Sequence, residues 1–153
     1  MTAPGTASRI GAFFDVDETL LSVKTMFDFL AFHLARAPIG DDADRARRLA
    51  RFREAAADKG VPREEVNRIY YEIYAGERAD DLAALGRVWF GLRRREPGFV
   101  HSRVLATLVR HRLAGHTIVL VSGSMPVCLD PFADASGRTT CCARGRSPAP
   151  TAC

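Results

Sequence analysis

The pattern of apolar and polar positions along the chain predicts two short strands separated by a long helical segment. Apolar runs cover residues 10–14 and 117–121, and the second run is rich in β-branched residues. Short runs that are apolar on both faces suit strands of a buried parallel sheet. Between the two runs, apolar residues recur at spacings of three and four. This spacing predicts helices over residues 25–36, 41–59, 62–74, 79–94 and 99–113.

The order of these elements indicates the fold class. The helix predicted over residues 99–113 is followed by Gly115 and then by the second strand. Helix, glycine turn and apolar strand form the return half of a right-handed strand–helix–strand crossover. A stand-alone helical bundle cannot accommodate the two flanking strands. The sequence therefore predicts an α/β fold with a parallel sheet and an inserted set of helices.

Composition is that of an ordinary globular chain. Of the 153 residues, 47% are apolar and 26% are charged, which allows one domain or a small core with an insert. The sequence has no run of 18 apolar residues of the kind that crosses a membrane. Residues 1–9 lack the apolar segment of a secretion signal, so a cytoplasmic location is expected.

Two aspartates, Asp15 and Asp17, stand one residue apart where the first strand ends. In open parallel sheets, ligands bind outside the carboxyl ends of the strands. One carboxylate can attack a phosphoryl group, and the other can move the proton of the leaving group. Their negative charge also favours Mg²⁺, which takes oxygen ligands. The alternative is a β-turn capped by an Asp side chain, because Asp favours such turns.

A second motif follows the second strand. Ser122 supplies a hydroxyl donor, and Gly123 allows a backbone N–H to approach a phosphate oxygen closely. Many buried strands end in Ser-Gly, so the pair alone is weak evidence. Its position in the chain makes it informative. It comes after Asp15-x-Asp17-x-Thr19 and is separated from it by the predicted helices.

Together the two motifs resemble those of the haloacid dehalogenase-like (HAD) hydrolases. The helical insert resembles the cap of the phosphoserine-phosphatase-like branch of that family. The resemblance implies a Rossmann-like core with an incomplete parallel sheet, formed by residues 9–24 and 97–134. It also implies a helical cap over residues 25–96, and caps of this kind close over the substrate and exclude water.

The resemblance implies an activity as well. It assigns Asp15 as the nucleophile and Asp17 as the general acid/base of a phosphomonoesterase that works through an aspartyl-phosphate. Thr19, Ser122 and Gly123 would bind the phosphoryl group. Mg²⁺ would be held by the Asp15 carboxylate and the Asp17 backbone carbonyl. The expected partner is a small phosphorylated metabolite, with no nucleic acid and no membrane.

The substrate is less defined. Phosphoserine phosphatases carry a serine at the position of Glu18 and a substrate-binding glutamate at the position of Lys24. A lysine cannot pair with a substrate ammonium, so an unspecified small phosphomonoester is favoured over phosphoserine. For Lys24 itself, a solvated side chain that contacts no substrate is the favoured interpretation.

Residues 135–153 differ from the rest of the chain and predict a disordered tail. From Ser136 onward there is no acid, no aromatic residue, and no valine, isoleucine, leucine or methionine. Three of the four cysteines lie there, but their spacing fits no zinc site. Without the three arginines of the tail, the formal net charge falls from +4 to +1. The basicity therefore does not indicate a nucleic-acid surface on the folded part.

The tail stands where the family carries further charged residues, namely a lysine after the second motif and a strand ending in Gly-Asp. Here the only lysines are Lys24 and Lys59, and the last acid is Asp134. We therefore expect a truncated HAD chain with an out-of-frame tail, an authentic disordered tail being the alternative. Four strand residues would then stay partly exposed beside missing strands: Phe13, Phe14, Ile118 and Leu120.

Three functions follow from these observations. The first is the Mg²⁺-dependent phosphomonoesterase, which rests on Asp15, Asp17 and Thr19. The second is an impaired or inactive HAD fragment, which the missing lysine and acids favour. The third is a basic nucleic-acid-binding module, which requires a basic face on folded elements.

Overall fold

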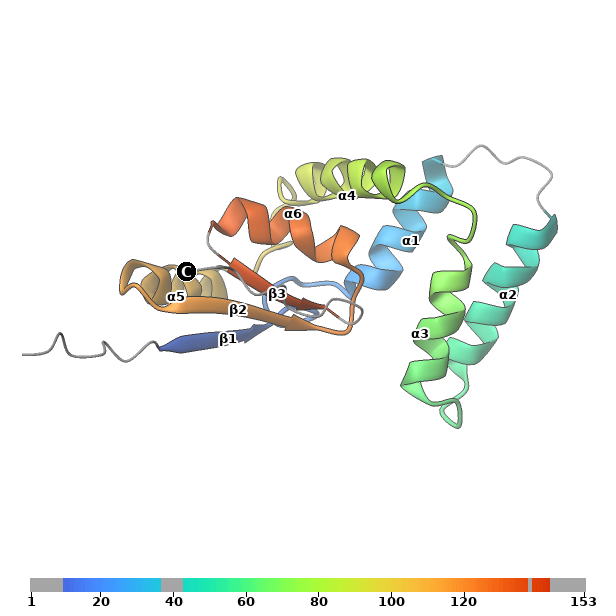
Figure 1. Ribbon diagram of the computed structural model, residues 1–153, viewed down its shortest axis with the longest axis horizontal. Helices are drawn as coiled ribbons and strands as arrows, with labels where there is room; N and C mark the ends of the chain where they lie inside the picture. The colour runs from blue at the N-terminus through green and yellow to red at the C-terminus, as the bar shows by residue number, and fades with distance from the viewer. Residues whose placement is uncertain (1–9, 37–42, 138, 144–153) are drawn as a thin grey trace, which may run out of the picture. The chain divides into compact units, whose positions relative to one another are not determined.

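The computed structural model describes residues 10–36, 43–137 and 139–143. In chain order they form β1 (Gly11–Asp15), α1 (Thr25–Arg36), α2 (Ala43–Ala57), α3 (Arg63–Glu72), α4 (Ala79–Arg93), α5 (Ser102–Leu113), β2 (Thr117–Ser122), α6 (Pro126–Ser136) and β3 (Thr139–Ala143) (Figure 1). The α/β class predicted from the sequence is confirmed. None of the helices in the described ranges has the length and apolar character that a membrane crossing requires.

The chain divides into two compact units. One holds residues up to Ala35 and from Ala83 onward, and the other spans Arg36–Leu82. The first unit therefore contains the sheet, α5, α6, nearly all of α1 and most of α4, whereas α2 and α3 belong to the second. The second unit is shorter than the predicted cap of residues 25–96, because α1 and α4 share an aromatic core with the sheet-bearing unit.

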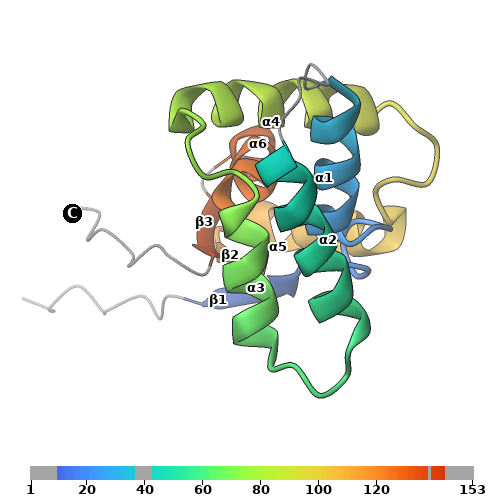
Figure 2. The same cartoon turned by 90° about the vertical axis from the view of Figure 1, so that its right-hand side faces the viewer.

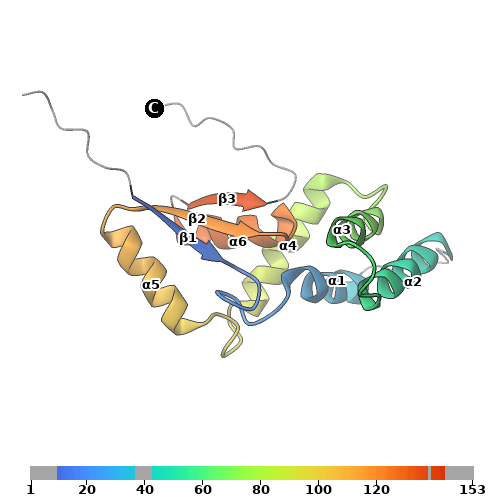
Figure 3. The same ribbon diagram turned by 90° about the horizontal axis from the view of Figure 1, so that it is seen from below.

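The sheet of the first unit has three parallel strands in the order β1-β2-β3 (Figure 3). Phe13 pairs with Val119, and Val119 pairs with Thr140. Because all three strands run in the same direction, their carboxyl ends lie at one edge. This edge carries Asp15 at the end of β1 and Ser122 at the end of β2.

Strand β3 differs from the sequence prediction. The sequence predicts disorder from residue 135, whereas α6 continues to Ser136 and Thr139–Ala143 pair with β2. Strand pairing uses backbone N–H and C=O groups, so a segment of small residues can pair without large apolar side chains. Residue 138 and residues 144–153 of the predicted tail lie outside the described residues.

In the described part of the chain, one face of the sheet is covered and the other is open. Phe14, Ile118 and Leu120 are buried, whereas Phe13 is 71% exposed and Val121 is 44% exposed. The expectation of exposed strand residues is therefore confirmed for Phe13 and wrong for the other three. Phe14 is covered because its ring meets that of His111 on α5 edge-on, with centroids 6.1 Å apart.

The connections explain why one face remains open. The chain passes from β1 through α5 to β2, and then through α6 to β3, always toward the same edge. Right-handed crossovers that advance in one direction place their helices on the same face of a sheet. Parallel sheets normally have both faces covered, so Phe13 and Val121 form an apolar surface that is unusual for such a sheet.

Helices α1, α4 and α6 contribute to an aromatic core in the first unit. Phe29 of α1 meets Trp89 of α4 edge-on with centroids 5.8 Å apart, and Trp89 meets Phe99 at 6.1 Å. Phe90 meets Phe132 of α6 at 5.9 Å. Edge-to-face aromatic pairs stabilise a core beyond the area that they bury. This core fixes α1, and therefore the segment that leads into it from β1.

A polar contact at the edge of this core also joins α1 to α4. Asp28 accepts hydrogen bonds from Trp89 Nε1 at 2.7 Å and from Arg93 Nη2 at 2.6 Å. Arg93 also donates to Glu96 at 2.9 Å. The hydrogen bonds to Glu96 and Asp28 raise the pKa of Arg93, so its charge is retained beside the core.

The second unit is a pair of helices. Helices α2 and α3 lie side by side and are joined by a short turn (Figure 2). Phe52 of α2 packs on Tyr70 of α3, with ring centroids 5.3 Å apart, and both are buried. The Tyr70 and Tyr74 hydroxyls are hydrogen-bonded at 2.8 Å, which satisfies two polar groups next to this contact.

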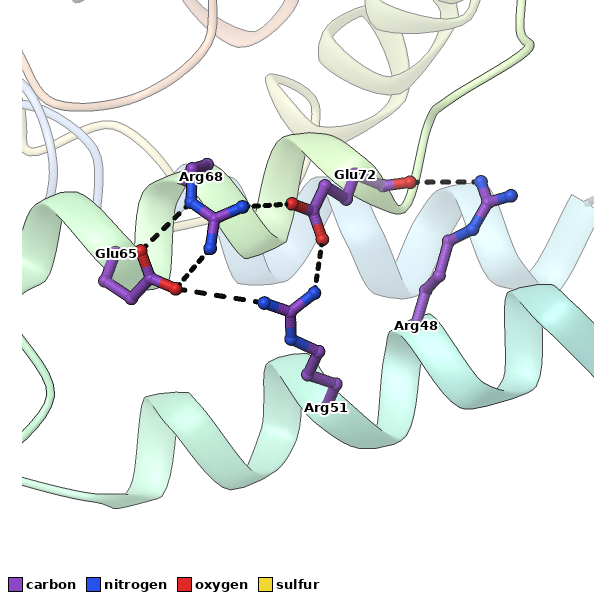
Figure 4. Close-up of polar contacts among 5 residues, drawn as sticks. All are labelled: Arg48, Arg51, Glu65, Arg68 and Glu72. Atoms are coloured by element: carbon purple, nitrogen blue, oxygen red, sulfur yellow. Dashed lines mark hydrogen bonds and ion pairs between the residues drawn. The ribbon is translucent and has the colours of Figure 1, made fainter.

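Ion pairs connect the exposed sides of α2 and α3 (Figure 4). Arg51 contacts Glu72 at 2.8 Å, and Arg68 contacts both Glu72 and Glu65 on its own helix. Arg48 donates to the Glu72 backbone carbonyl at 3.1 Å. The hydrogen bond from Arg68 is the main reason that the pKa of Glu65 is lowered. Exposed pairs of this kind add little stability, so we interpret the network as setting the register of the two helices.

Candidate active site

A tight loop follows β1 and carries the first motif. The Val16 carbonyl accepts hydrogen bonds from the backbone N–H groups of Leu20 and Leu21 at 3.0 and 2.9 Å. Val16, Leu20 and Leu21 are fully buried. Because these three side chains anchor the loop in the core, Asp15 is left exposed and Asp17 half-buried on the other side of the backbone.

Within the described residues, the Asp15 carboxylate accepts a hydrogen bond through one oxygen only. Thr19 Oγ1 donates to Asp15 Oδ2 at 2.5 Å, and Asp15 Oδ1 accepts no hydrogen bond from a described residue. The structure thus brings the predicted nucleophile and the predicted phosphate-binding threonine into contact. One oxygen of the Asp15 carboxylate remains free to contact a ligand.

Asp17 is held by three donors. Its Oδ1 accepts from the backbone N–H and the hydroxyl of Thr25, at 2.6 and 2.7 Å. Its Oδ2 accepts from the Ser122 hydroxyl at 2.5 Å. Thr25 is the first residue of α1, so Asp17 also lies at the positive end of a helix. These interactions fix the position of the Asp17 carboxylate.

The second motif extends the network into the interior. The Ser124 backbone N–H donates to Ser122 Oγ at 3.0 Å, and Ser124 Oγ lies 2.6 Å from Thr25 Oγ1. Because Asp17 can only accept, the single hydroxyl proton of Thr25 is directed to Asp17, and Ser124 then donates to Thr25. Thr25 and Ser124 are fully buried. The network therefore joins the end of β2 to the start of α1.

Two of these residues were not predicted from the sequence. Thr25 and Ser124 lie 99 positions apart, and neither belongs to the two motifs that the sequence analysis identified. One signal was available for Thr25, since threonine at the start of a predicted helix often accepts or donates capping hydrogen bonds. Ser124 could be noticed only as a second serine beside Ser122-Gly123.

Gly123 lies in open space at the carboxyl edge of the sheet. It is exposed, and a Cβ atom placed on it would meet no other atom within 4 Å. The absence of a side chain leaves room for a ligand to approach the backbone between β2 and α6. The phosphate-binding role of Gly123 stays a prediction, and Ser122 next to it is buried.

Oxygen atoms at this edge fit part of a Mg²⁺ shell. Asp15 Oδ1 and the Asp17 backbone carbonyl accept no hydrogen bond from the described residues. Carboxylate and carbonyl oxygens are ligands that Mg²⁺ takes, with water and substrate oxygens supplying the rest. Within the described ranges, no group of three or more His, Cys, Asp or Glu side chains is placed to hold a metal ion.

Lys24 is paired on the surface of the loop. Its Nζ lies 3.6 Å from Glu18 Oε2, and both side chains are more than half exposed. Glu18 has a φ of +58°, which is uncommon for a residue with a side chain. Water screens an exposed pair of this kind, so it contributes little to stability.

The family of the haloacid dehalogenase-like hydrolases matches residues 12–145, a range that includes both motifs. The chain belongs to the haloacid dehalogenase-like hydrolase family. The family resemblance stated from Asp15, Asp17 and Ser122 is therefore confirmed, and the fold agrees with it. The phosphoserine-phosphatase-like branch stays a prediction.

A solved structure is similar to this HAD chain in fold. It is the crystal structure of a protein of unknown function from Bordetella pertussis Tohama I, with a TM-score of 0.71 and 23% sequence identity. The match covers 90% of this chain and 60% of the Bordetella protein, so the chain spans 60% of that protein's length. No curated protein matches the chain.

The buried hydroxyl of Thr25 gives a testable prediction about the network. Thr25→Val keeps the shape of the side chain but removes a donor from Asp17 and the partner of Ser124. We expect the free energy of unfolding to fall by about 1–3 kcal/mol, since buried polar groups are left unpaired. Thr25→Ser keeps the hydroxyl and should lose much less. Urea unfolding of both variants measures the difference, and equal stability of Thr25→Val and wild type would contradict the network.

Proposed function

We propose that this HAD chain carries the nucleophile and the acid/base of a Mg²⁺-dependent phosphomonoesterase that acts on a small phosphorylated metabolite. One observation supports this most directly. Asp15 presents a free carboxylate oxygen at the carboxyl edge of the sheet, beside an Asp17 carboxylate that three donors hold in place. Helices α1 to α4, which follow the first motif and precede α5, support a member of the phosphoserine-phosphatase-like branch.

The reaction would proceed in two displacements. First, an Asp15 oxygen attacks the phosphorus while the bond to the leaving alkoxide breaks, and Asp17 gives its proton to that oxygen. Second, Asp17 removes a proton from a water molecule, which attacks the phosphorus of the aspartyl-phosphate. The second displacement releases inorganic phosphate and restores the Asp15 carboxylate. Asp17 returns to its protonated state, so the two aspartates are unchanged after each cycle.

The hydroxyl groups of the site would change partners when phosphate binds. Thr19 donates to Asp15 and Ser122 donates to Asp17, and each hydroxyl has one proton. To bind a phosphoryl oxygen, each must turn away from its aspartate. The backbone at Gly123 lies in open space, so a phosphoryl oxygen can approach it without such a change. The same turn releases Asp17 Oδ2, which then becomes available to hold a proton.

Mg²⁺ would be held by the Asp15 carboxylate and the Asp17 backbone carbonyl. It would supply positive charge that offsets the repulsion between the Asp15 carboxylate and an incoming phosphate. Catalysis of phosphoryl transfer depends mainly on positioning and charge. The rate should therefore depend strongly on how many cationic groups surround the phosphate.

A second candidate is a phosphate-binding HAD chain with little turnover. The sequence favours it at one point, because both lysines, Lys24 and Lys59, precede Ser122 and the last acid is Asp134. A phosphoryl group bound at Ser122 and Gly123 would then have less neutralising charge around it than in a family member that carries the further lysine and acids. Binding would remain, since hydroxyl and backbone donors supply it.

Turnover of an aryl phosphate with Mg²⁺ tests the proposal. We expect release of the phenol and, after acid quenching, a phosphorylated peptide that contains Asp15. Binding of inorganic phosphate without either signal would support the second candidate. Absence of phosphate binding, of turnover and of the phosphorylated peptide would overturn both.

A further inference from the structure

We infer that His111 and His116 form a second metal site, specific for a borderline divalent transition metal such as Ni²⁺ and separate from the carboxylate edge. The Nδ1 atoms of the two imidazoles lie 2.8 Å apart. His111 is in the last turn of α5, and His116 immediately precedes β2. Both rings are half-buried, with centroids 5.1 Å apart.

The distance between the nitrogens fits two neighbouring ligands of one metal ion. Imidazole nitrogens bind such ions at about 2.0 Å, so two ligands at an angle of about 90° lie about 2.8 Å apart. A tetrahedral angle would require a separation of about 3.3 Å. The pair therefore fits a square-planar or octahedral ion with water in its other positions, the geometry that Ni²⁺ and Cu²⁺ adopt.

The backbone holds both rings near this position. The His116 N–H donates to the His111 carbonyl at 3.1 Å, and the Gly115 N–H donates to the Arg112 carbonyl at 3.0 Å. Gly115 has a φ of +78°, which a residue with a side chain rarely adopts. On the other side, the ring of Phe14 contacts His111 edge-on. Little ordering of the backbone is therefore needed when an ion binds, and the rings have only to turn so that both Nδ1 atoms face it.

The proton balance of binding is simple. In the metal-free pair, one Nδ1–H donates to the lone pair of the other Nδ1. An ion replaces this proton, which moves through solvent to Nε2 of the same ring. Both imidazoles stay neutral and each keeps one N–H. Neither Nε2 is bonded to a described residue, so the change of tautomer breaks no other contact in that part of the chain.

The helix end next to the pair favours a cation. His111 lies at the carboxyl end of α5, where the helix dipole is negative. The two flanking guanidinium groups are bonded elsewhere: Arg110 donates to Thr107, and Arg112 donates to the Ser136 carbonyl. The donor atoms are nitrogens, so the pair selects borderline ions and not Mg²⁺.

This site is distant from the aspartates and does not depend on the proposed function. His116 precedes β2, whereas Ser122 ends it, and six residues of strand extend about 20 Å. A preparation without phosphatase activity can therefore still show the site.

Titration of the untagged chain with NiCl₂, followed by NMR of the imidazole rings, tests the site. We expect the ring signals of His111 and His116 to broaden first, before those of His101. His116→Gln and His111→Gln should each weaken Ni²⁺ binding about tenfold or more. His101→Gln, at the exposed start of the same helix, is the matched control and should leave binding unchanged.

If a variant fails to fold, the titration of the wild-type chain alone still tests the metal site. Broadening that begins at the cysteines of residues 139–143, or that affects all histidines equally, would overturn the proposal. So would Ni²⁺ binding to a folded His111→Gln or His116→Gln variant at wild-type strength. Zn²⁺ and Mg²⁺ serve as comparison ions, and equal binding of Mg²⁺ would also contradict a nitrogen-donor site.

Discussion

Replacement of Asp15 by asparagine is expected to abolish both phosphate turnover and the phosphorylated intermediate. An amide is a poor nucleophile and cannot form the aspartyl-phosphate, so turnover should fall by about 10⁴-fold or more. The fold should be retained, because Asp15 is exposed and its one hydrogen bond in the described part of the chain is donated by Thr19. Steady-state hydrolysis of an aryl phosphate and acid-quench mass spectrometry measure the two losses.

Glu18→Gln is the matched control for this experiment. It removes the same charge from the same loop, but Glu18 contacts Lys24 at the surface and none of the other site residues. We expect turnover close to that of wild type. Full turnover by Asp15→Asn, or equal loss in both variants, would rule out Asp15 as the nucleophile.

A large effect on stability is also expected from Gly86→Ala in α4. A Cβ at position 86 would lie 2.3 Å from the backbone carbonyl oxygen of Val127 in α6. Contacts this short force the two helices apart, and such overpacking typically costs about 1–3 kcal/mol. The loss should appear although alanine is intrinsically favoured over glycine in a helix by about 1 kcal/mol.

Gly91→Ala in the same helix is the control. A Cβ at position 91 would meet no other atom within 4 Å, so only the helix preference of alanine should act. We therefore expect opposite shifts, with a lower melting temperature for Gly86→Ala and an unchanged or higher one for Gly91→Ala. Equal shifts in thermal unfolding would show that α4 and α6 do not approach as closely as described.

The sequence by itself was sufficient for the features that depend on local patterns. Helices over residues 25–36 and 79–94 were predicted because the spacing of apolar residues and the turn residues around them act over a few positions. Asp15 and Ser122 were recognised because each directly follows an apolar strand, and the parallel sheet places both at one edge.

Only the tertiary structure decided the features that join distant segments. Thr25 and Ser124 meet because α1 starts beside the end of β2, and no local pattern records a contact across 99 positions. Residues 139–143 form a strand because β2 offers them backbone partners, although their side chains alone predict disorder. Phe13 is exposed and Phe14 is buried because both crossover helices lie on one face of the sheet. The strand order decides which face this is, and the pattern of residues within β1 does not record it.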